Sequence, residues 1–169
     1  MPSLFNFRTL LCIAALGTTL TAAAQDNPPS ETVSVVAQLY RDFAWEVVIE
    51  EPGTPEKSLL EQPREVLTKY FDDNLTALFL KDRACVNKTG ELCNLDYSPI
   101  WAAQDPAAAQ LKVLDAKKPG VVIVKFRQPA EKKNVELSYR MTKTKQGWRI
   151  SDITERSYGS LVSNLSRKL

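Results

Sequence analysis

Residues 95–106, LDYSPIWAAQDP, crowd acids and aromatics into one short stretch that could do chemistry. Carboxylates can serve as general acid and base, and aromatic rings can hold a ligand by stacking. Short acids also accept backbone N–H bonds in turns, which gives the same residues a purely structural interpretation. We favour the structural role, in which Pro99 and Ile100 dock the adjacent tryptophan on the core. If the stretch instead forms a binding surface, its members are Asp96, Tyr97, Trp101, Gln104 and Asp105.

A second group with chemical potential is the cysteine pair Cys85 and Cys93, which brackets CVNKTGELC. Two cysteines in an exported domain usually form a disulfide, and a redox-active pair normally has the closer spacing C-x-x-C. Polar residues and Gly90 between them indicate a closed surface loop. Asn87 and Lys88 would then lie at the tip of this loop, where they could contact a partner.

The missing residue types are informative about catalysis. The chain has no histidine, so the commonest general base and the commonest nitrogen ligand of metals are missing. It also has no glycine-rich phosphate loop. Paired carboxylates remain as an alternative, and the candidate acids are Asp72, Asp73, Asp96 and Asp105. We predict no catalytic residue, no metal site and no cofactor.

The first 24 residues have the layout of a secretory signal. Arg8 precedes an apolar run from Leu10 to Leu20, and Ala22-Ala23-Ala24 provides small residues for cleavage. The run is shorter than the roughly 20 apolar residues that a spanning helix needs. We therefore predict a signal peptide over residues 1–24, a disordered leader over 25–29 and one periplasmic domain over 30–169, without membrane insertion after cleavage.

Composition fits one balanced domain. A chain of about 150 residues buries roughly 68–70% of its unfolded surface, which suffices for a core. The 22 basic and 20 acidic side chains give a net charge of +2. This balance argues against nucleic acid or an anionic membrane as the partner. A monomer or weak dimer is expected.

Helices are predicted in the first half of the chain. Residues 31–50 form an amphipathic helix with Ser30 as its N-cap. Its buried face consists of Val33, Val36, Leu39, Tyr40, Phe43 and Val47. Trp45 lies off this stripe and either covers the helix end or belongs to a contact surface. Pro63 opens a second helix, and Asp72 or Asp73 caps a third.

Strands are predicted in the second half. The segments 109–116, 121–128, 134–144 and 148–154 are rich in β-branched residues or alternate between apolar and polar, and short turns connect them. This pattern indicates a four-stranded antiparallel meander. Residues 160–169 add a short terminal helix. The predicted class is α+β, with helices packed on one face of a curved sheet and a groove between them that is either open or filled by aromatic side chains.

The segment LDYSPIWAAQD and the later GWRISDI resemble motifs of a family of small exported bacterial domains of unknown function. The matching residues are Asp96, Pro99, Gln104, Asp105, Trp148, Ile150, Asp152 and Ile153. The resemblance implies an α+β roll like that of nuclear transport factor two and of cystatins. It implies no catalytic residues, and this fold serves enzymes, binding modules and inert scaffolds.

Three functions are weighed. The leading hypothesis is a non-enzymatic periplasmic binding or accessory protein, whose sheet or groove contacts another envelope protein or a small ligand. The second is an immunity or inhibitor protein that blocks an envelope-targeted toxin or hydrolase with its Cys85–Cys93 loop. The third is a hydrolase that depends on Asp96 or Asp105 and requires a deep cavity holding two acids.

Overall fold

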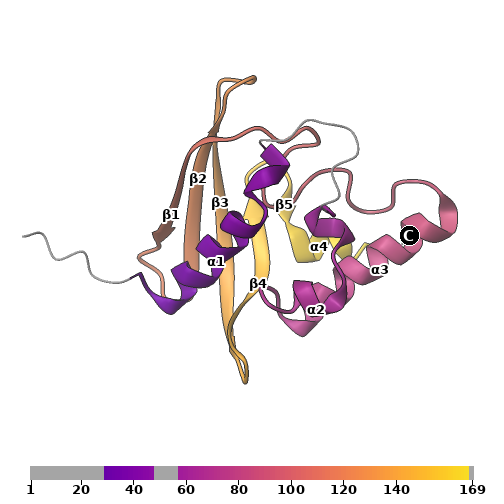
Figure 1. The fold of residues 1–169 in the computed structure, drawn as a ribbon, viewed down its shortest axis with the longest axis horizontal. Coiled ribbons are helices and arrows are strands. Elements are labelled where there is room, and N and C mark those ends of the chain that lie inside the picture. The colour runs from indigo at the N-terminus through magenta and orange to yellow at the C-terminus, as the bar shows by residue number, and fades with distance from the viewer. Residues whose placement is uncertain (1–28, 48–56, 168–169) are drawn as a thin grey trace, which may run out of the picture.

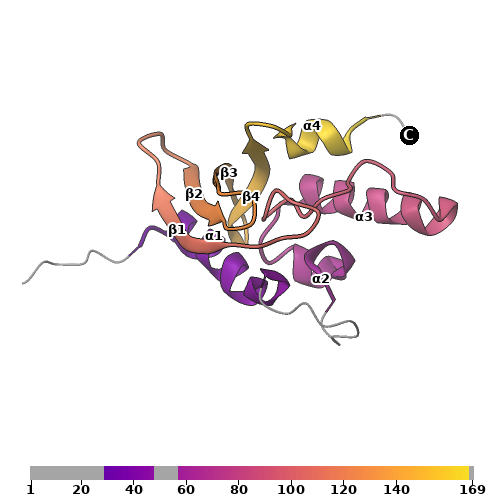
Figure 2. The same cartoon turned by 90° about the horizontal axis from the view of Figure 1, so that it is seen from above.

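The computed structural model describes residues 29–47 and 57–167. Figure 1 shows an antiparallel sheet with one helix across its face and further helices beside it. Figure 2 shows the same arrangement from above, with the longest helix extending away from the sheet. The predicted α+β class is confirmed. The predicted signal peptide and leader lie outside the described residues, apart from the last leader residue, and the signal stays a prediction.

Along the chain, most helices come first and the strands follow. The helices are α1 (Glu31–Asp42), α2 (Arg64–Leu67), α3 (Asp73–Thr89) and α4 (Leu161–Leu165), with short 3-10 helices η1 (Ala44–Val47) and η2 (Leu59–Glu61). The strands are β1 (Ala109–Asp115), β2 (Val121–Gln128), β3 (Lys133–Thr144), β4 (Gly147–Glu155) and β5 (Gly159–Ser160).

Helix α1 begins as predicted and ends earlier. Ser30 is its N-cap, with Oγ accepting from the N–H of Val33 at 3.3 Å. The predicted stripe is buried from Val33 to Phe43. The α-helix ends at Asp42 and continues as the 3-10 turn η1, while residues 48–50 lie outside the described part of the chain. Since a 3-10 turn also repeats every three residues, the apolar spacing could not reveal this change.

Helix α3 begins as predicted and ends later. Of the two candidate caps, Asp72 is the N-cap, and its Oδ1 accepts from the N–H of Leu75 at 2.8 Å. The helix then runs through Cys85 to Thr89, so half of the predicted surface loop is helical. Gly90, with φ of 73°, ends it in a left-handed cap. The polar composition of this stretch reflects its exposure, not an absence of helix.

The sheet is an antiparallel meander in the order β1-β2-β3-β4-β5, one strand more than predicted. The additional β5 has only two residues, which is too short for an alternating pattern. Alternation holds in β2 and β3, where Val124 and Leu137 face the core. It fails in β1, where an irregularity between Ala109 and Lys112 leaves Leu111 39% exposed.

Strand β4 ties the helices to the sheet. Ile150 is buried and donates its N–H to the carbonyl of Tyr70 at 2.8 Å, and its own carbonyl accepts from Asp72 N–H at 3.0 Å. The connection between α2 and α3 therefore covers part of the β4 edge, and β5 covers another part. Trp148, also on β4, is half-buried against the hydrophobic core.

Aromatic side chains fill the space between α1 and the sheet. Tyr40 donates its Oη–H to the carbonyl of Ile100 at 2.6 Å and shares a 2.7 Å hydrogen bond with the Tyr139 hydroxyl. Burial raises the pKa of Tyr40 well above its usual value. Trp101 packs edge-on against Tyr40, with ring centroids 4.9 Å apart. Of the two predicted states of the groove between sheet and helices, the filled one is found here.

Candidate functional site: a stapled groove

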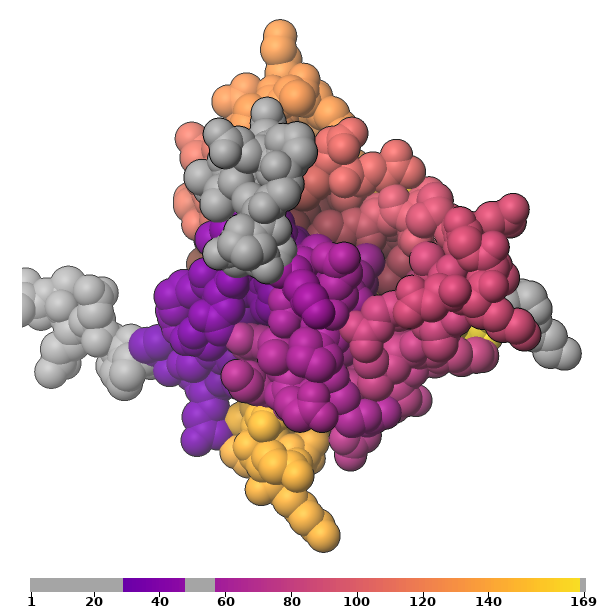
Figure 3. All heavy atoms as spheres, turned by 45° about the vertical axis from the view of Figure 1, so that its right-hand side comes forward, coloured from indigo at the N-terminus to yellow at the C-terminus, as the bar shows by residue number. Residues whose placement is uncertain are grey.

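A groove opens instead where η2, α3 and residues 92–106 meet. It consists of two adjoining hollows of about 630 and 380 Å³, which share the side chains of Leu60, Leu92 and Leu95. We name it the stapled groove. In Figure 3 its walls lie side by side on one face, residues 57–67 in purple and α3 with the following loop in pink.

Segments far apart in sequence line the two hollows. The first hollow is lined by Lys57, Leu60, Glu61, Pro63, Phe79, Asp82, Arg83, Val86, Asn87, Leu92 and Leu95. The second is lined by Trp45, Glu46, Ser58, Leu59, Leu60, Leu92, Leu95, Asp96, Tyr97, Ser98, Gln104 and Pro106.

The floor of the groove is apolar and firmly packed. Leu59, Phe79 and Leu95 belong to the hydrophobic core and are at most 4% exposed. Leu92, on the border between the hollows, is 71% exposed. This is the largest exposure of any large hydrophobic side chain in the described ranges. Leu92 is thus an exposed apolar side chain at the border of two hollows with apolar floors, where contact with a partner would bury it.

The predicted disulfide between Cys85 and Cys93 is confirmed and holds one wall of the groove. It joins α3 to the residue after Leu92, with the two Cα atoms 6.2 Å apart. Thr89 strengthens the turn, because its hydroxyl donates to the carbonyl of Cys85 at 3.0 Å and accepts from the N–H of Glu91 at 3.2 Å. The staple therefore fixes where Leu92 stands.

Asn87 and Lys88, predicted at a loop tip, lie in the last turns of α3. Both are exposed, and Asn87 lines the first hollow. Helix α3 projects from the body of the molecule, so its stapled end forms the tip in place of a free loop (Figures 1 and 2).

Glu46 is an important residue of the groove that sequence reasoning missed. Its Oε1 accepts from the N–H of Leu59 at 2.7 Å, and its Oε2 accepts from Trp101 Nε1 at 2.9 Å and Ser98 Oγ at 3.4 Å. The carboxylate thus links η1, η2 and the 98–101 turn. Its position three residues after Phe43, on the inner stripe, was the signal that could have indicated burial.

The pKa of Glu46 is raised by burial, and the hydrogen bonds from Leu59 N–H and the Trp101 indole oppose this effect only in part. A carboxyl whose pKa is raised by folding binds its proton more tightly in the native state. Its contribution to stability is therefore fully present below the unfolded pKa and is lost as the pH rises through the folded pKa.

The variant Glu46→Gln tests the direction of this pKa shift, because glutamine does not titrate. We expect the free energy of unfolding of the wild type, minus that of Glu46→Gln, to increase as the pH falls from 7 to 4.5. Urea unfolding of both proteins at the two pH values measures this difference. A difference that stays constant, or that shrinks at low pH, would contradict a raised pKa at Glu46.

The other predicted site residues divide between groove and core. Asp96 and Gln104 line the second hollow, both exposed, and Gln104 Nε2 donates to Asp96 Oδ2 at 3.1 Å. They bond each other across the loop, whereas backbone N–H partners were predicted. Asp105 is exposed and lines neither hollow. Trp101 is 1% exposed, which fits its structural interpretation and removes it from the candidate binding surface.

Tyr97 contributes an aromatic wall to the second hollow. It is 9% exposed, and its ring stacks on that of Tyr158 with centroids 3.9 Å apart and planes at 16°. Asn164 Nδ2 lies 3.5 Å from its hydroxyl. Helix α4 and the turn before it therefore position this part of the groove from behind.

The acids considered for catalysis are separated. Asp72 and Asp73 line a different hollow beside Arg149, and Asp72 is occupied as the cap of α3. Asp96 lies in the stapled groove. Within residues 29–47 and 57–167 no group of three or more acids and cysteines is placed to hold a metal ion. None of the helices in those ranges is long and apolar enough to span a membrane.

Comparisons with protein-family models, curated proteins and solved structures find no match to this chain. The resemblance to exported bacterial domains therefore stays a prediction.

Proposed function

We propose that this protein is an exported binding protein that holds a segment of another protein in the stapled groove. One observation carries the proposal: Leu92, 71% exposed, stands over an apolar floor and is fixed there by the disulfide next to it. Burying such a side chain against a partner contributes about 1.5–3 kcal/mol. A partner would also cover the floor residues of both hollows.

Rigidity of the walls supports this proposal. Binding is weakened by the entropy of ordering loops and side chains, so a surface that is already fixed binds more tightly. The disulfide fixes the α3 wall, and Glu46 fixes the opposite wall through Leu59 and Trp101. Both walls thus have little ordering entropy left to lose.

The proposed compartment is the periplasm. It rests on the signal layout of residues 1–24, which lie outside the described part. The Cys85–Cys93 disulfide supports it, because structural disulfides persist in oxidising compartments.

An inhibitor or immunity protein is the second candidate. The projecting end of α3 favours it, because a rigid exposed tip can enter the active site of a target (Figures 1 and 2). In this mode Lys88 and Leu92 would lead the contact. Substitution Lys88→Glu would then weaken inhibition, whereas Lys88 does not line the groove and its substitution would leave groove binding nearly unchanged.

Site-specific crosslinking tests the proposed function. A photoreactive amino acid is placed at Leu92 and, as the matched control, at Leu114, a 42% exposed leucine on β1. In cells that export the protein, we expect one discrete protein adduct from position 92 and none from position 114. The adduct should decrease when Leu60, which lines both hollows, is also replaced by Glu. Equal labelling from both positions, or none from position 92, would overturn the proposal.

A further inference from the structure

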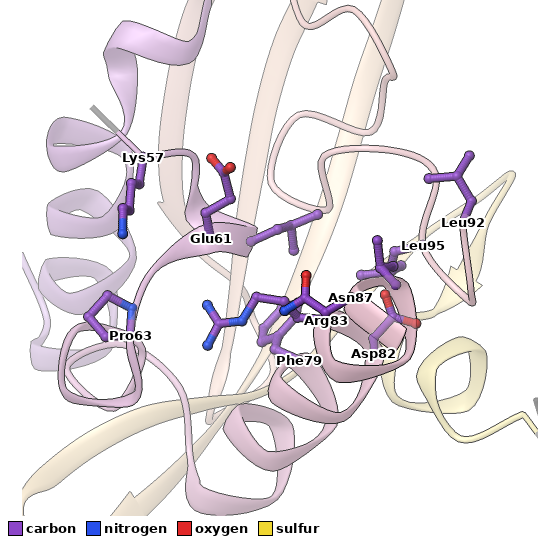
Figure 4. A pocket seen from close by; sticks show the side chains of 11 residues that line it. Lys57, Glu61, Pro63, Phe79, Asp82, Arg83, Asn87, Leu92 and Leu95 are labelled. Carbon is purple, nitrogen blue, oxygen red and sulfur yellow. The ribbon is translucent and has the colours of Figure 1, made fainter. Parts of the chain in front are cut away.

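The first hollow is lined by two acids, Glu61 and Asp82, and two cations, Lys57 and Arg83. Its two acids are occupied by backbone groups: Glu61 Oε2 accepts from the N–H of Ser58 at 2.9 Å, and Asp82 Oδ1 accepts from the N–H of Asn94 at 2.7 Å. Figure 4 shows the Glu61 carboxylate directed away from Arg83 and Pro63, and Asp82 at the end near Leu95. Both carboxylates therefore have structural partners of their own.

The two cations of the hollow point toward a common space. Figure 4 shows the Lys57 ammonium and the Arg83 guanidinium directed toward the same space beside Pro63. Arg83 Nη1 donates to the carbonyl of Gln62 at 2.7 Å, which fixes the guanidinium and leaves its other donors available. Neither cation forms an ion pair with any residue that the structure describes.

From this geometry we infer, on the basis of the proposed function, that the stapled groove receives the C-terminal end of a polypeptide. The terminal carboxylate lies between Arg83 and Lys57, and the last apolar side chains rest on Phe79 and Leu95. Guanidinium groups bind carboxylates through paired, charge-assisted hydrogen bonds, and apolar walls strengthen such bonds by excluding water. The chain then runs toward Leu92 and the second hollow.

The lining of the second hollow favours a polypeptide over an alkyl chain with a carboxylate head. Gln104, Ser98 and Asp96 place donors and acceptors among its apolar residues. Gln104 and Asp96 bond each other and Ser98 bonds Glu46, but an alkyl chain would leave their remaining donors and acceptors without partners, which is costly once water is excluded. The N–H and C=O groups of an extended peptide can bond to them.

The test uses random octapeptides displayed with free carboxyl ends, selected on the purified, oxidised protein. The best peptide is synthesised as the acid and as the C-terminal amide, and fluorescence anisotropy gives Kd for each. We expect the acid to bind the wild type at least about tenfold more tightly than the amide. The ratio should fall toward one in Arg83→Gln, recover in large part in Arg83→Lys, and stay unchanged in Arg127→Gln, an exposed arginine on β2.

The other outcomes separate this inference from the proposed function. Equal affinity for acid and amide, with loss of both in Leu92→Glu, would overturn the C-terminal inference and leave the proposed groove binding intact. The C-terminal inference would also be overturned, in favour of a fatty acid, by a second result. In that result dodecanoate displaces the peptide from Arg83, and the peptides show no preference for the acid over the amide. Selected peptides that bind Leu92→Glu as well as the wild type would overturn both.

Discussion

Replacing Trp101 by alanine is expected to lower the free energy of unfolding by about 4 kcal/mol. The side chain is 1% exposed and packs edge-on against Phe126, with ring centroids 5.7 Å apart. Alanine would leave a cavity between α1 and the sheet, and it would also remove the indole N–H that donates to the Glu46 carboxylate. Urea unfolding at pH 7, followed by far-ultraviolet circular dichroism, measures the loss.

The matched control is Trp148→Ala, because Trp148 is the same residue type but only half-buried on β4. Its ring contacts solvent, and the Lys143 ammonium lies 5.3 Å from its centroid. We expect a loss of about 1–1.5 kcal/mol, since only part of the ring leaves water on folding. If Trp101→Ala cost no more than Trp148→Ala, the 95–106 loop would not be fastened to the core as described.

The sheet was the most predictable part of the fold. Strict alternation in β3 requires one buried face, and Val135, Leu137 and Tyr139 are at most 2% exposed. Local signals of this kind depend only on neighbouring residues. The same reasoning identified Ser30 as a helix cap and narrowed the cap of α3 to Asp72 or Asp73, because a cap also acts within a few residues.

The stapled groove could not be predicted in this way. Its walls come from η1, η2, α3 and the 92–106 loop, and no periodic pattern relates segments that meet only after folding. The Glu46 carboxylate accepts from Leu59 and Trp101, which come from distant parts of the chain. The sequence indicated that 95–106 and the cysteines mattered, but not that the loop and the wall held by the disulfide border the same groove.

Net charge is equally silent about local arrangement. A balance of 22 basic and 20 acidic side chains indicates an ordinary solvated surface. The structure nevertheless directs Lys57 and Arg83 toward one space, while the carboxylates of Glu61 and Asp82 accept from backbone N–H groups. A selective anion site can therefore exist in a protein without a basic composition. Composition predicts long-range fields, whereas recognition depends on where individual charges are held.

Replacing both cysteines, Cys85→Ser and Cys93→Ser, is expected to lower the free energy of unfolding by about 2.5 kcal/mol according to the chain-entropy estimate for so short a ring. The local effect should be sharper. Without the staple, the last turn of α3 depends on bonds such as that from Gly90 N–H to the Val86 carbonyl at 2.8 Å. In the double-serine variant, we expect hydrogen exchange to be faster at the amides of this turn than at the N–H of Phe43, which bonds to the Leu39 carbonyl at the end of α1.

Reductant provides the control for this prediction. Dithiothreitol should bring the wild type to the urea midpoint and exchange rates of the double-serine variant, and it should change neither quantity in that variant. The freed turn should also reduce the crosslinking yield from position 92, because Leu92 is no longer held over the groove. If reduced and oxidised wild type unfold at the same urea concentration, Cys85 and Cys93 do not hold this wall, and the rigidity on which groove binding depends must come from Glu46 alone.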